Sequence, residues 1–116
     1  MPARRNRVTR GEDYRYVMRS GRRVGGALCI THAVFHVSDH PARFGYIVSK
    51  AVGNAVVRNR VRRRLKAITE GHINAGFSGA DIVFRALPAS AAATFLDLDK
   101  EVSRALAKLQ SESVRA

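Results

Sequence analysis

Arginine dominates the middle of this sequence, and the chemistry it offers there is anion binding. Residues 50–66 contain seven bases and no acid. A guanidinium group presents a fixed fork of N–H donors, which binds phosphate oxygens in pairs and stacks on nucleobases. Like charges one turn apart destabilise a helix by about 0.2–0.5 kcal/mol per pair, so a merely solvated face normally interleaves acids with bases. The stretch therefore predicts contact with a polyanion, and nucleic acid is the favoured one.

The chain offers little for covalent or protein-bound metal catalysis. Carboxylates are few and lie mostly in the C-terminal third, and no histidine stands at a motif spacing from an acid or a serine. Cys29 is the single cysteine, which excludes an intramolecular disulfide and, with four scattered histidines, a cysteine-rich zinc cluster. Its apolar neighbours Leu28 and Ile30 predict a buried structural thiol. The sequence leaves any protein-bound metal site undefined.

Almost all the excess charge lies in two blocks of a chain with the length of one domain. The 116 residues contain 21 Lys and Arg against 9 Asp and Glu, a net charge of +12, and 46% of them are hydrophobic. The first block, residues 1–30, supplies additional basic residues that we expect to contact the polyanion: Arg7, Arg10, Arg22 and Arg23. We expect no membrane partner: no apolar stretch reaches the roughly 18 residues of a span, and the start of the sequence, residues 1–7, lacks the apolar segment of a secretory signal. We expect a soluble, cytoplasmic protein that is a monomer on its own.

Asn54 predicts the start of the basic helix, which would run from about residue 55 to about residue 73. At about 100° per residue, one side of this helix gathers an apolar stripe that would sit on a sheet: Val57, Val61, Leu65 and Ile68. The wheel assigns the opposite surface to five bases, with Arg58, Arg62 and Lys66 at its centre and Arg63 and Arg60 beside them. Arg64 lies near the apolar edge, where its stem can pack while its guanidinium reaches solvent. Gly53 fits either a tight turn or a helix start that binds an anion.

The remaining pattern alternates helices with strands. Thr9 and Glu12 have the spacing of a capping box before a short helix over residues 9–19. Residues 28–37 and 44–49 are rich in strand-forming residues, and the turn between them predicts an antiparallel pair. Residues 81–86 read as a short buried strand, and residues 94–110 as an amphipathic helix capped by Thr94. The inward stripe of that helix would be Phe95, Leu98, Val102, Leu106 and Leu109.

These elements predict a single domain over residues 1–116, with its core at about residues 4–110 and frayed termini. Helices would cover the sheet, on one of its faces.

The stretch from Val48 to Leu65 resembles the signature of the protein subunit of bacterial ribonuclease P. The similarity includes the Arg58-Asn59-Arg60 core of that motif. Residues 11–23 are similar to the first helix of the family and the turn after it, and residues 81–86 to its late strand. The resemblance extends over about residues 4–110.

The resemblance implies both fold and activity. The fold would be an α/β (α+β) two-layer sandwich, a small mixed sheet covered by helices, with a left-handed βαβ crossover through the basic helix, against the usual right hand. The protein would be a subunit of ribonuclease P, the endoribonuclease that removes the 5′ leader of precursor tRNA and so generates the mature 5′ end. Its partners would be the catalytic RNA and precursor tRNA. The RNA, with Mg²⁺, would perform the hydrolysis, and no protein side chain would be catalytic.

The resemblance also assigns roles by position. The surface facing the catalytic RNA would comprise Lys50, Arg58, Asn59, Arg60, Arg62, Arg63 and Lys66. The leader would lie between the first helix and the sheet, against Tyr14, Met18 and His32. Only Tyr14 is a plain aromatic residue, although a thioether and an imidazole can also lie flat on a base.

Several alternatives stay open at this level. Tyr14 and Met18 could instead be core residues of an amphipathic helix, and His32 an ordinary strand histidine. One rival function is a ribosomal-type protein that binds RNA without processing it. The other is a DNA-binding regulator that uses residues 58–66 as a recognition helix. The regulator is disfavoured because a nearly all-arginine helix has few of the mixed polar residues that read base edges.

Overall fold

The computed structural model describes residues 3–36 and 39–115, which form four strands, three α-helices and two short 3₁₀ turns. In chain order these are η1 (Arg4–Asn6), α1 (Gly11–Ser20), β1 (Arg22–Gly25), β2 (Cys29–Phe35), β3 (Arg43–Ile47), α2 (Ala55–Asn74), β4 (Ala80–Ala86), η2 (Pro88–Ala91) and α3 (Phe95–Arg115). Val37, the predicted end of one strand, lies outside the described residues. Across the described ranges, no helix is both long enough and apolar enough to span a bilayer.

The strands form one mixed sheet in the order β1-β2-β4-β3. β1 and β4 run antiparallel to β2, whereas β3 pairs with β4 in parallel. The predicted antiparallel pair between residues 28–37 and 44–49 is therefore wrong, because β4 lies between these two strands. Ile82, Val83 and Phe84 of β4 have no exposed surface. Such a run needs cover on both faces of the sheet.

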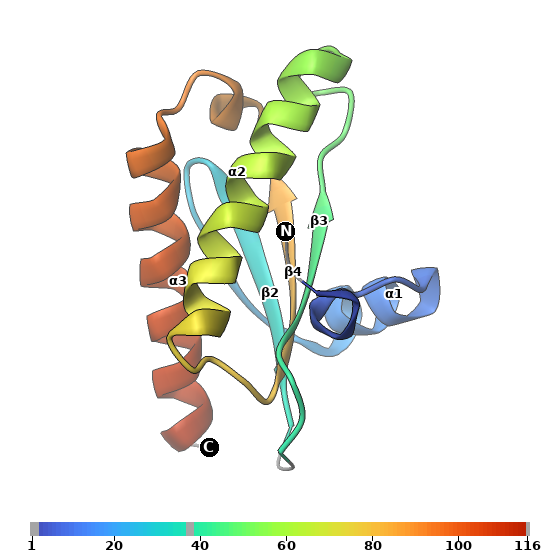
Figure 1. The fold of residues 1–116 in the computed structure, drawn as a ribbon, viewed down its shortest axis with the longest axis vertical. Helices are drawn as coiled ribbons and strands as arrows, with labels where there is room; N and C mark the ends of the chain where they lie inside the picture. The colour runs from blue at the N-terminus through green and yellow to red at the C-terminus, as the bar shows by residue number, and fades with distance from the viewer. Residues whose placement is uncertain (1–2, 37–38, 116) are drawn as a thin grey trace.

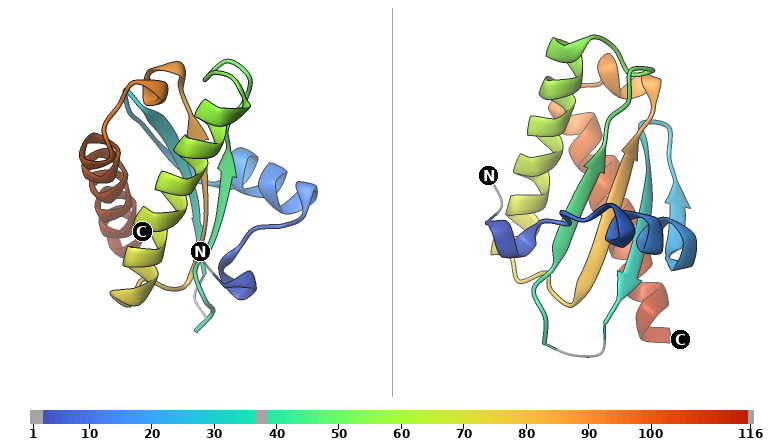
Figure 2. Two further views of the ribbon diagram at one scale, coloured as in Figure 1. Left: turned by 45° about the horizontal axis from the view of Figure 1, so that its top comes forward. Right: turned by 90° about the vertical axis from the view of Figure 1, so that its right-hand side faces the viewer.

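Helix α2 connects the parallel strands β3 and β4 across one face of the sheet. Seen from that face with both strands pointing up, β4 lies to the left of β3, so the crossover is left-handed (Figures 1 and 2). Nearly all connections of this kind are right-handed. The α+β fold with a left-handed crossover, which the resemblance implied, is confirmed.

Helices lie on both faces of the sheet, which corrects the expectation that they cover one. α2 and α3 pack side by side on one face, and α1 crosses the opposite face (Figure 2). Successive strand residues point to opposite faces. Val83 therefore points toward α1, while its neighbours Ile82 and Phe84 point toward α2 and α3. The one buried residue of α1 is Val17.

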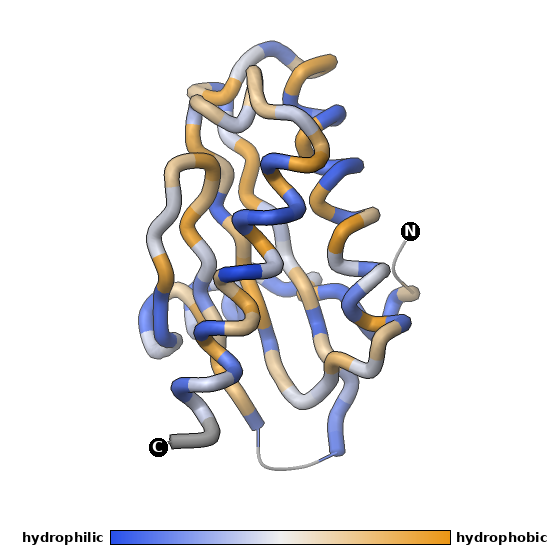
Figure 3. The backbone as a smooth tube through the Cα atoms, turned by 90° about the vertical axis from the view of Figure 1, so that its left-hand side faces the viewer, coloured by the Kyte–Doolittle hydropathy of each residue, from blue (hydrophilic) through white to orange (hydrophobic). Residues whose placement is uncertain are grey.

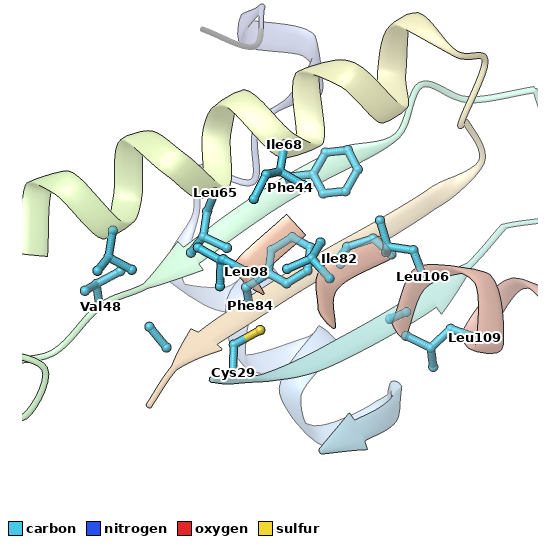
Figure 4. Packing of buried hydrophobic residues seen from close by; sticks show 14 of the residues in the cluster. Cys29, Phe44, Val48, Leu65, Ile68, Ile82, Phe84, Leu98, Leu106 and Leu109 are labelled. Atoms are coloured by element: carbon cyan, nitrogen blue, oxygen red, sulfur yellow. The ribbon is translucent and has the colours of Figure 1, made fainter. Parts of the chain in front are cut away.

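The main core lies between the sheet and the helices α2 and α3 (Figure 4). α2 buries Val61, Leu65 and Ile68, as its stripe predicted, and polar positions alternate with these along the helix (Figure 3). The buried residues from α3 include Leu98, Val102, Leu106 and Leu109. Phe95, the first residue of the predicted α3 stripe, is instead 43% exposed, because α3 begins there at the rim of the core.

Capping residues fix the starts of the two long helices. The side chain of Asn54 accepts a hydrogen bond from Val57 N (3.0 Å), and Thr94 Oγ1 accepts one from Asp97 N (3.1 Å), as predicted. The capping box at Thr9 is wrong, because α1 begins at Gly11 and its N-cap residue, Arg10, makes no side-chain capping bond.

The turn between β1 and β2 is fixed to α3 by one carboxylate. Glu101 accepts hydrogen bonds from the backbone N–H groups of Ala27 (2.9 Å), Leu28 (3.0 Å) and Cys29 (2.8 Å). A Cβ atom on Gly26 would lie 2.5 Å from this carboxylate, so a side chain there would push Glu101 away from these bonds. Burial, reinforced by the charge of Glu101, raises the pKa of the Cys29 thiol to about 12. Cys29 is thus the buried structural thiol that the sequence predicted.

Candidate nucleic-acid interface

The bases of α2 do not all point away from the core. The exposed crest of the helix carries Asn59 and Arg63, together with Val56, which is 73% exposed. The three bases predicted at the centre of the exposed surface, Arg58, Arg62 and Lys66, are half-buried along one flank. This flank lies beside the buried Thr69, because Arg58 and Thr69 are eleven positions apart and point only about 20° from each other. The predicted orientation of these three bases is corrected accordingly.

On the other flank of α2, two arginines bind the chain itself. Arg60 Nη2 donates to the carbonyl of Ala91 (2.9 Å), and Arg64 Nη1 donates to the carbonyl of Ala93 (2.7 Å). The position of Arg64 on the helical wheel predicted a guanidinium that reaches solvent. In the structure this guanidinium binds a backbone carbonyl instead. Both carbonyls belong to the connection that leads into α3. These two side chains consequently join the basic helix to the start of α3.

Several carboxylates of the chain are engaged away from α2. Asp81 binds Arg43 and His36, and Asp13 lies 3.7 Å from Arg43. Glu101, as described above, binds backbone N–H groups. On α2 itself, Arg62 is paired with an amide and not with a carboxylate: Asn59 Oδ1 accepts a hydrogen bond from Arg62 Nη1 (3.1 Å).

A cleft of about 200 Å³ at the outer edge of β3 contains bases from both basic blocks. Its lining includes Arg7 from the first block and Arg62 and Lys66 from the second. The N-terminal segment reaches this edge because Val8 N donates to the carbonyl of Phe44 (2.9 Å). One arginine of the first block thus lies in the same cleft as two bases that come about 55 positions later in the sequence.

Tyr14 connects this cleft to the face of the sheet that α1 covers. Its hydroxyl oxygen accepts a hydrogen bond from Tyr46 N (3.3 Å), a free N–H at the edge of β3. Its ring lies over Gly45, and both Tyr14 and Met18 stay half-exposed. Val17 is the core residue of α1. Tyr14 and Met18 therefore keep surface that can contact a ligand.

His32 lies on the same face but is only 6% exposed. It pairs with Arg23 on β1 and with Val83 on β4. Burial, followed by the charges of Arg23 and Arg85, lowers the pKa of His32, so its ring favours the neutral form. Its Nδ1 atom has no hydrogen-bond partner in the described part of the chain. His32 offers much less surface to a leader than Tyr14 does.

Residues 1–110 match the family described as Ribonuclease P. The chain belongs to the ribonuclease P protein family. The ribonuclease P protein component of Clavibacter michiganensis subsp. michiganensis is 45% identical to it over 108 residues, covering 93% of this chain and 96% of that protein. The corresponding protein of Acidothermus cellulolyticus is 42% identical over 106 residues, covering 90% of this chain and 88% of that protein.

Solved structures of ribonuclease P proteins have the same fold. The Staphylococcus aureus protein aligns with a TM-score of 0.79 at 25% identity, covering 90% of this chain and 96% of that one. The Thermotoga maritima protein aligns with a TM-score of 0.75 at 19% identity, covering 92% of this chain and 97% of that one. The second likeness concerns the fold alone.

In this member of the ribonuclease P family, the other predicted basic contacts are spread over several elements. Lys50 is exposed in the loop before α2, and Arg10 is exposed beside Glu12 (3.5 Å). Arg22 and Arg23 are exposed on β1, at the edge of the sheet opposite β3. Arg7 alone of the additional contacts joins the bases of α2 in the cleft.

Sequence reasoning missed one ionic cluster, formed by His36, His40 and Asp81, whose ligand-type atoms lie within 4.8 Å of one another. The carboxylate of Asp81 already receives Nε (2.8 Å) and Nη2 (2.7 Å) of Arg43. A guanidinium at this distance disfavours a second cation on the same oxygens. In this ribonuclease P protein the cluster is therefore centred on the ion pair between Arg43 and Asp81, and it joins β4 to the connection between β2 and β3.

Proposed function

We propose that the chain, as the protein component of ribonuclease P, binds the catalytic RNA along α2 and the 5′ leader of precursor tRNA across α1. The observation that carries this proposal is the cleft beside β3, in which Arg62 and Lys66 of α2 lie next to Tyr14 of α1. One surface can therefore contact both RNAs where they meet. The assembly would act in the bacterial cytoplasm, where tRNA precursors are transcribed.

The two RNA-binding regions would differ in their chemistry. The crest and flank of α2 offer cations for phosphates of a folded RNA, which is recognised largely by its shape and its backbone. The α1 face offers the Tyr14 ring and the Met18 thioether, which suit the unstacked bases of a single strand. Leader bases would stack there while α2 holds the catalytic RNA.

The chemical step would belong to the RNA. Phosphodiester hydrolysis needs an activated water, and Mg²⁺ held by RNA phosphates would supply it. The buried carboxylate of this protein does not fit a magnesium site, because Arg43 occupies both oxygens of Asp81. The protein would act by positioning the substrate and by neutralising phosphate charge.

Reconstitution tests the proposal. The protein is added to a bacterial ribonuclease P RNA at low Mg²⁺, and leader release from precursor tRNA is followed. We expect stimulation by the wild type and its loss when Arg62, Arg63 and Lys66 are all replaced by alanine. The matched control replaces three exposed bases of α3 by alanine: Lys100, Arg104 and Lys108. The control removes the same charge and should still stimulate.

The main alternative is RNA binding without processing. It predicts that the wild type binds the RNA and leaves the rate of leader release unchanged. Equal behaviour of the α2 and α3 triple variants would show that net charge matters and the α2 surface does not.

A further inference from the structure

A second hollow lies where α2 meets the start of α3. Arg60, Arg63, Arg64, Ala67 and Phe95 line it. Phe95 exposes 43% of its surface, although its position fits the apolar stripe of α3. The hollow therefore combines an accessible aromatic ring with three arginines. Packing of α3 against the core does not explain why an aromatic residue is exposed at this position.

Two of these arginines are held in place by the segment that leads to the ring. Arg60 donates to the carbonyl of Ala91 and Arg64 to that of Ala93, which lies two residues before Phe95. A guanidinium has five N–H donors, so one such bond leaves others for a ligand. The bonds reduce the rotamer freedom that the side chains would otherwise lose on binding. Arg63, by contrast, is exposed to solvent, where it can reach a phosphate.

An exposed aromatic ring beside cations has the chemistry of a stacking site for one nucleotide. The ring offers a face to any base, and the arginines neutralise the adjoining phosphate. The net charge of +12 favours an RNA over a protein as the occupant of an apolar surface so placed. The nearest acid in sequence, Asp97, projects about 200° around the helix from Phe95 and so leaves the ring side of α3 free of its charge.

We propose that this hollow receives one unpaired nucleotide of the catalytic RNA, with its base stacked on Phe95 and its phosphate bound by Arg63. The inference rests on the proposed function and adds a base-stacking contact to the phosphate contacts of α2. It also extends the RNA-binding surface from α2 onto the first turn of α3.

Substitutions at position 95 test this contact through the affinity for a bacterial ribonuclease P RNA. We expect Phe95→Ala and Phe95→Leu each to weaken binding about tenfold, within the range measured for loss of one stacked base. Phe95→Trp keeps an aromatic face and should bind at least as well as the wild type. Leu96→Ala is the matched control, because Leu96 is the adjacent residue and is 58% exposed.

Salt dependence separates the two parts of the site. Phe95→Leu should leave the slope of log affinity against log salt unchanged, because stacking releases no counterion. Arg63→Ala should reduce the magnitude of that slope by nearly one. Circular dichroism and the thermal midpoint identify any variant that has lost its fold. If Phe95→Ala is unfolded, the affinity of Phe95→Leu for the RNA alone tests the stacking contact.

Each outcome separates this inference from the proposed function. If the wild type binds the RNA and Phe95→Leu binds equally well, Phe95 does not stack on a base and the inference is wrong, while the proposed function stands. The same conclusion follows if Phe95→Leu retains affinity that Phe95→Ala loses, since a plain apolar contact would then suffice. If the wild type itself fails to bind or to stimulate the RNA, the proposed function fails first.

Discussion

The ring of Tyr14 lies directly against the backbone of Gly45. A Cβ atom on residue 45 would approach Tyr14 Cε1 to 2.5 Å, Cζ to 2.6 Å and the hydroxyl oxygen to 2.8 Å. Real Cβ atoms do not tolerate such distances, so a strand residue without a side chain is what allows the ring to rest there. The hydroxyl of Tyr14 then accepts the free N–H of Tyr46, which fixes the ring at the edge of the sheet.

Gly45→Ala should therefore displace the Tyr14 ring. We expect affinity for precursor tRNA to fall several-fold in the reconstituted particle, with affinity for mature tRNA unchanged. Gly25→Ala is the matched control, because the new methyl group would have no heavy atom within 4 Å. Equal effects of the two substitutions would show that Gly45 has no particular role in placing Tyr14.

Tyr14→Ala should weaken binding of precursor tRNA more than binding of mature tRNA. Removing one stacked base costs about 1–3 kcal/mol, so the difference should be at least fivefold. Tyr14→Phe keeps the ring and should behave nearly as the wild type. Binding of the two tRNAs is compared by equilibrium titration of the assembled particle. Losses of the same size for both tRNAs would identify Tyr14 as a purely structural residue.

The affinity for the catalytic RNA should fall steeply with salt. If about six phosphates are neutralised, the log–log slope is about −4 to −5. Replacing Arg62, Arg63 and Lys66 by alanine should reduce its magnitude by about 2 to 3, whereas the α3 triple variant should keep the full slope. Arg60 is left in place in this test because its bond to Ala91 also serves the fold. A titration from 50 to 200 mM salt measures the effect.

Asp81 should stabilise the fold only above acidic pH. Burial alone would raise its pKa, but hydrogen bonds from Arg43 and His36 hold the pKa below its ordinary value of 3.8. Because the folded pKa is lower than the unfolded one, the contribution is present above about pH 4 and is lost as the pH falls through the folded pKa. We expect Asp81→Asn to lower the free energy of unfolding at pH 7 by about 2 kcal/mol.

Denaturant titrations of both proteins from pH 7 to pH 2 check this prediction. The difference between wild type and Asp81→Asn should shrink below pH 4. A difference that stays constant across this range would mean that the charge of Asp81 contributes nothing.

Glu101→Gln should release the turn between β1 and β2. The neutral amide offers a single carbonyl oxygen to the three N–H groups, so the free energy of unfolding should fall by about 1–3 kcal/mol. The buried thiol of Cys29 is then exposed more often by local opening. Its rate of reaction with an aromatic disulfide reagent at neutral pH should rise, whereas Glu12→Gln, at an exposed position, should leave it unchanged. An unaltered rate in Glu101→Gln would show that this carboxylate does not hold the turn.

The sequence predicted the long helices well because their signals are local. The Asn54 and Thr94 caps and the apolar stripe of α2 depend on residues three or four positions apart. β1 was missed, since Arg22, Arg23 and Gly25 carry no apolar alternation and become a strand only by pairing with β2. The pairing of residues 28–37 with 44–49 was wrong for a similar reason. A short turn favours the hairpin, and nothing near it shows that a strand made about 35 residues later will separate the two.

The candidate site, like the fold, was predicted correctly only where its signals are local in the sequence. Arginine content marked α2 as the candidate RNA-binding element, but a helical wheel drawn from the apolar stripe alone misplaced Arg58. The buried Thr69 shows that Arg58 lies on a flank of the helix. Arg7 and Arg62 line the same cleft only because the N-terminal segment reaches the edge of β3. The ring of Tyr14 can lie against β3 only because residue 45 is a glycine. These contacts join residues more than 30 positions apart. Only the family resemblance pointed to the left-handed connection.

The strand order has a consequence for the protein while it is being made. β4 is the last strand to leave the ribosome, yet it lies between β2 and β3. The sheet cannot close until residue 86 has emerged, so both arginine-rich blocks are translated before they have a folded surface to occupy. Nascent chains on one messenger RNA would therefore expose unfolded arginine-rich segments, which bind any nearby RNA non-specifically. Once β4 is complete the sheet can form, and the same arginines then occupy fixed positions on a folded surface.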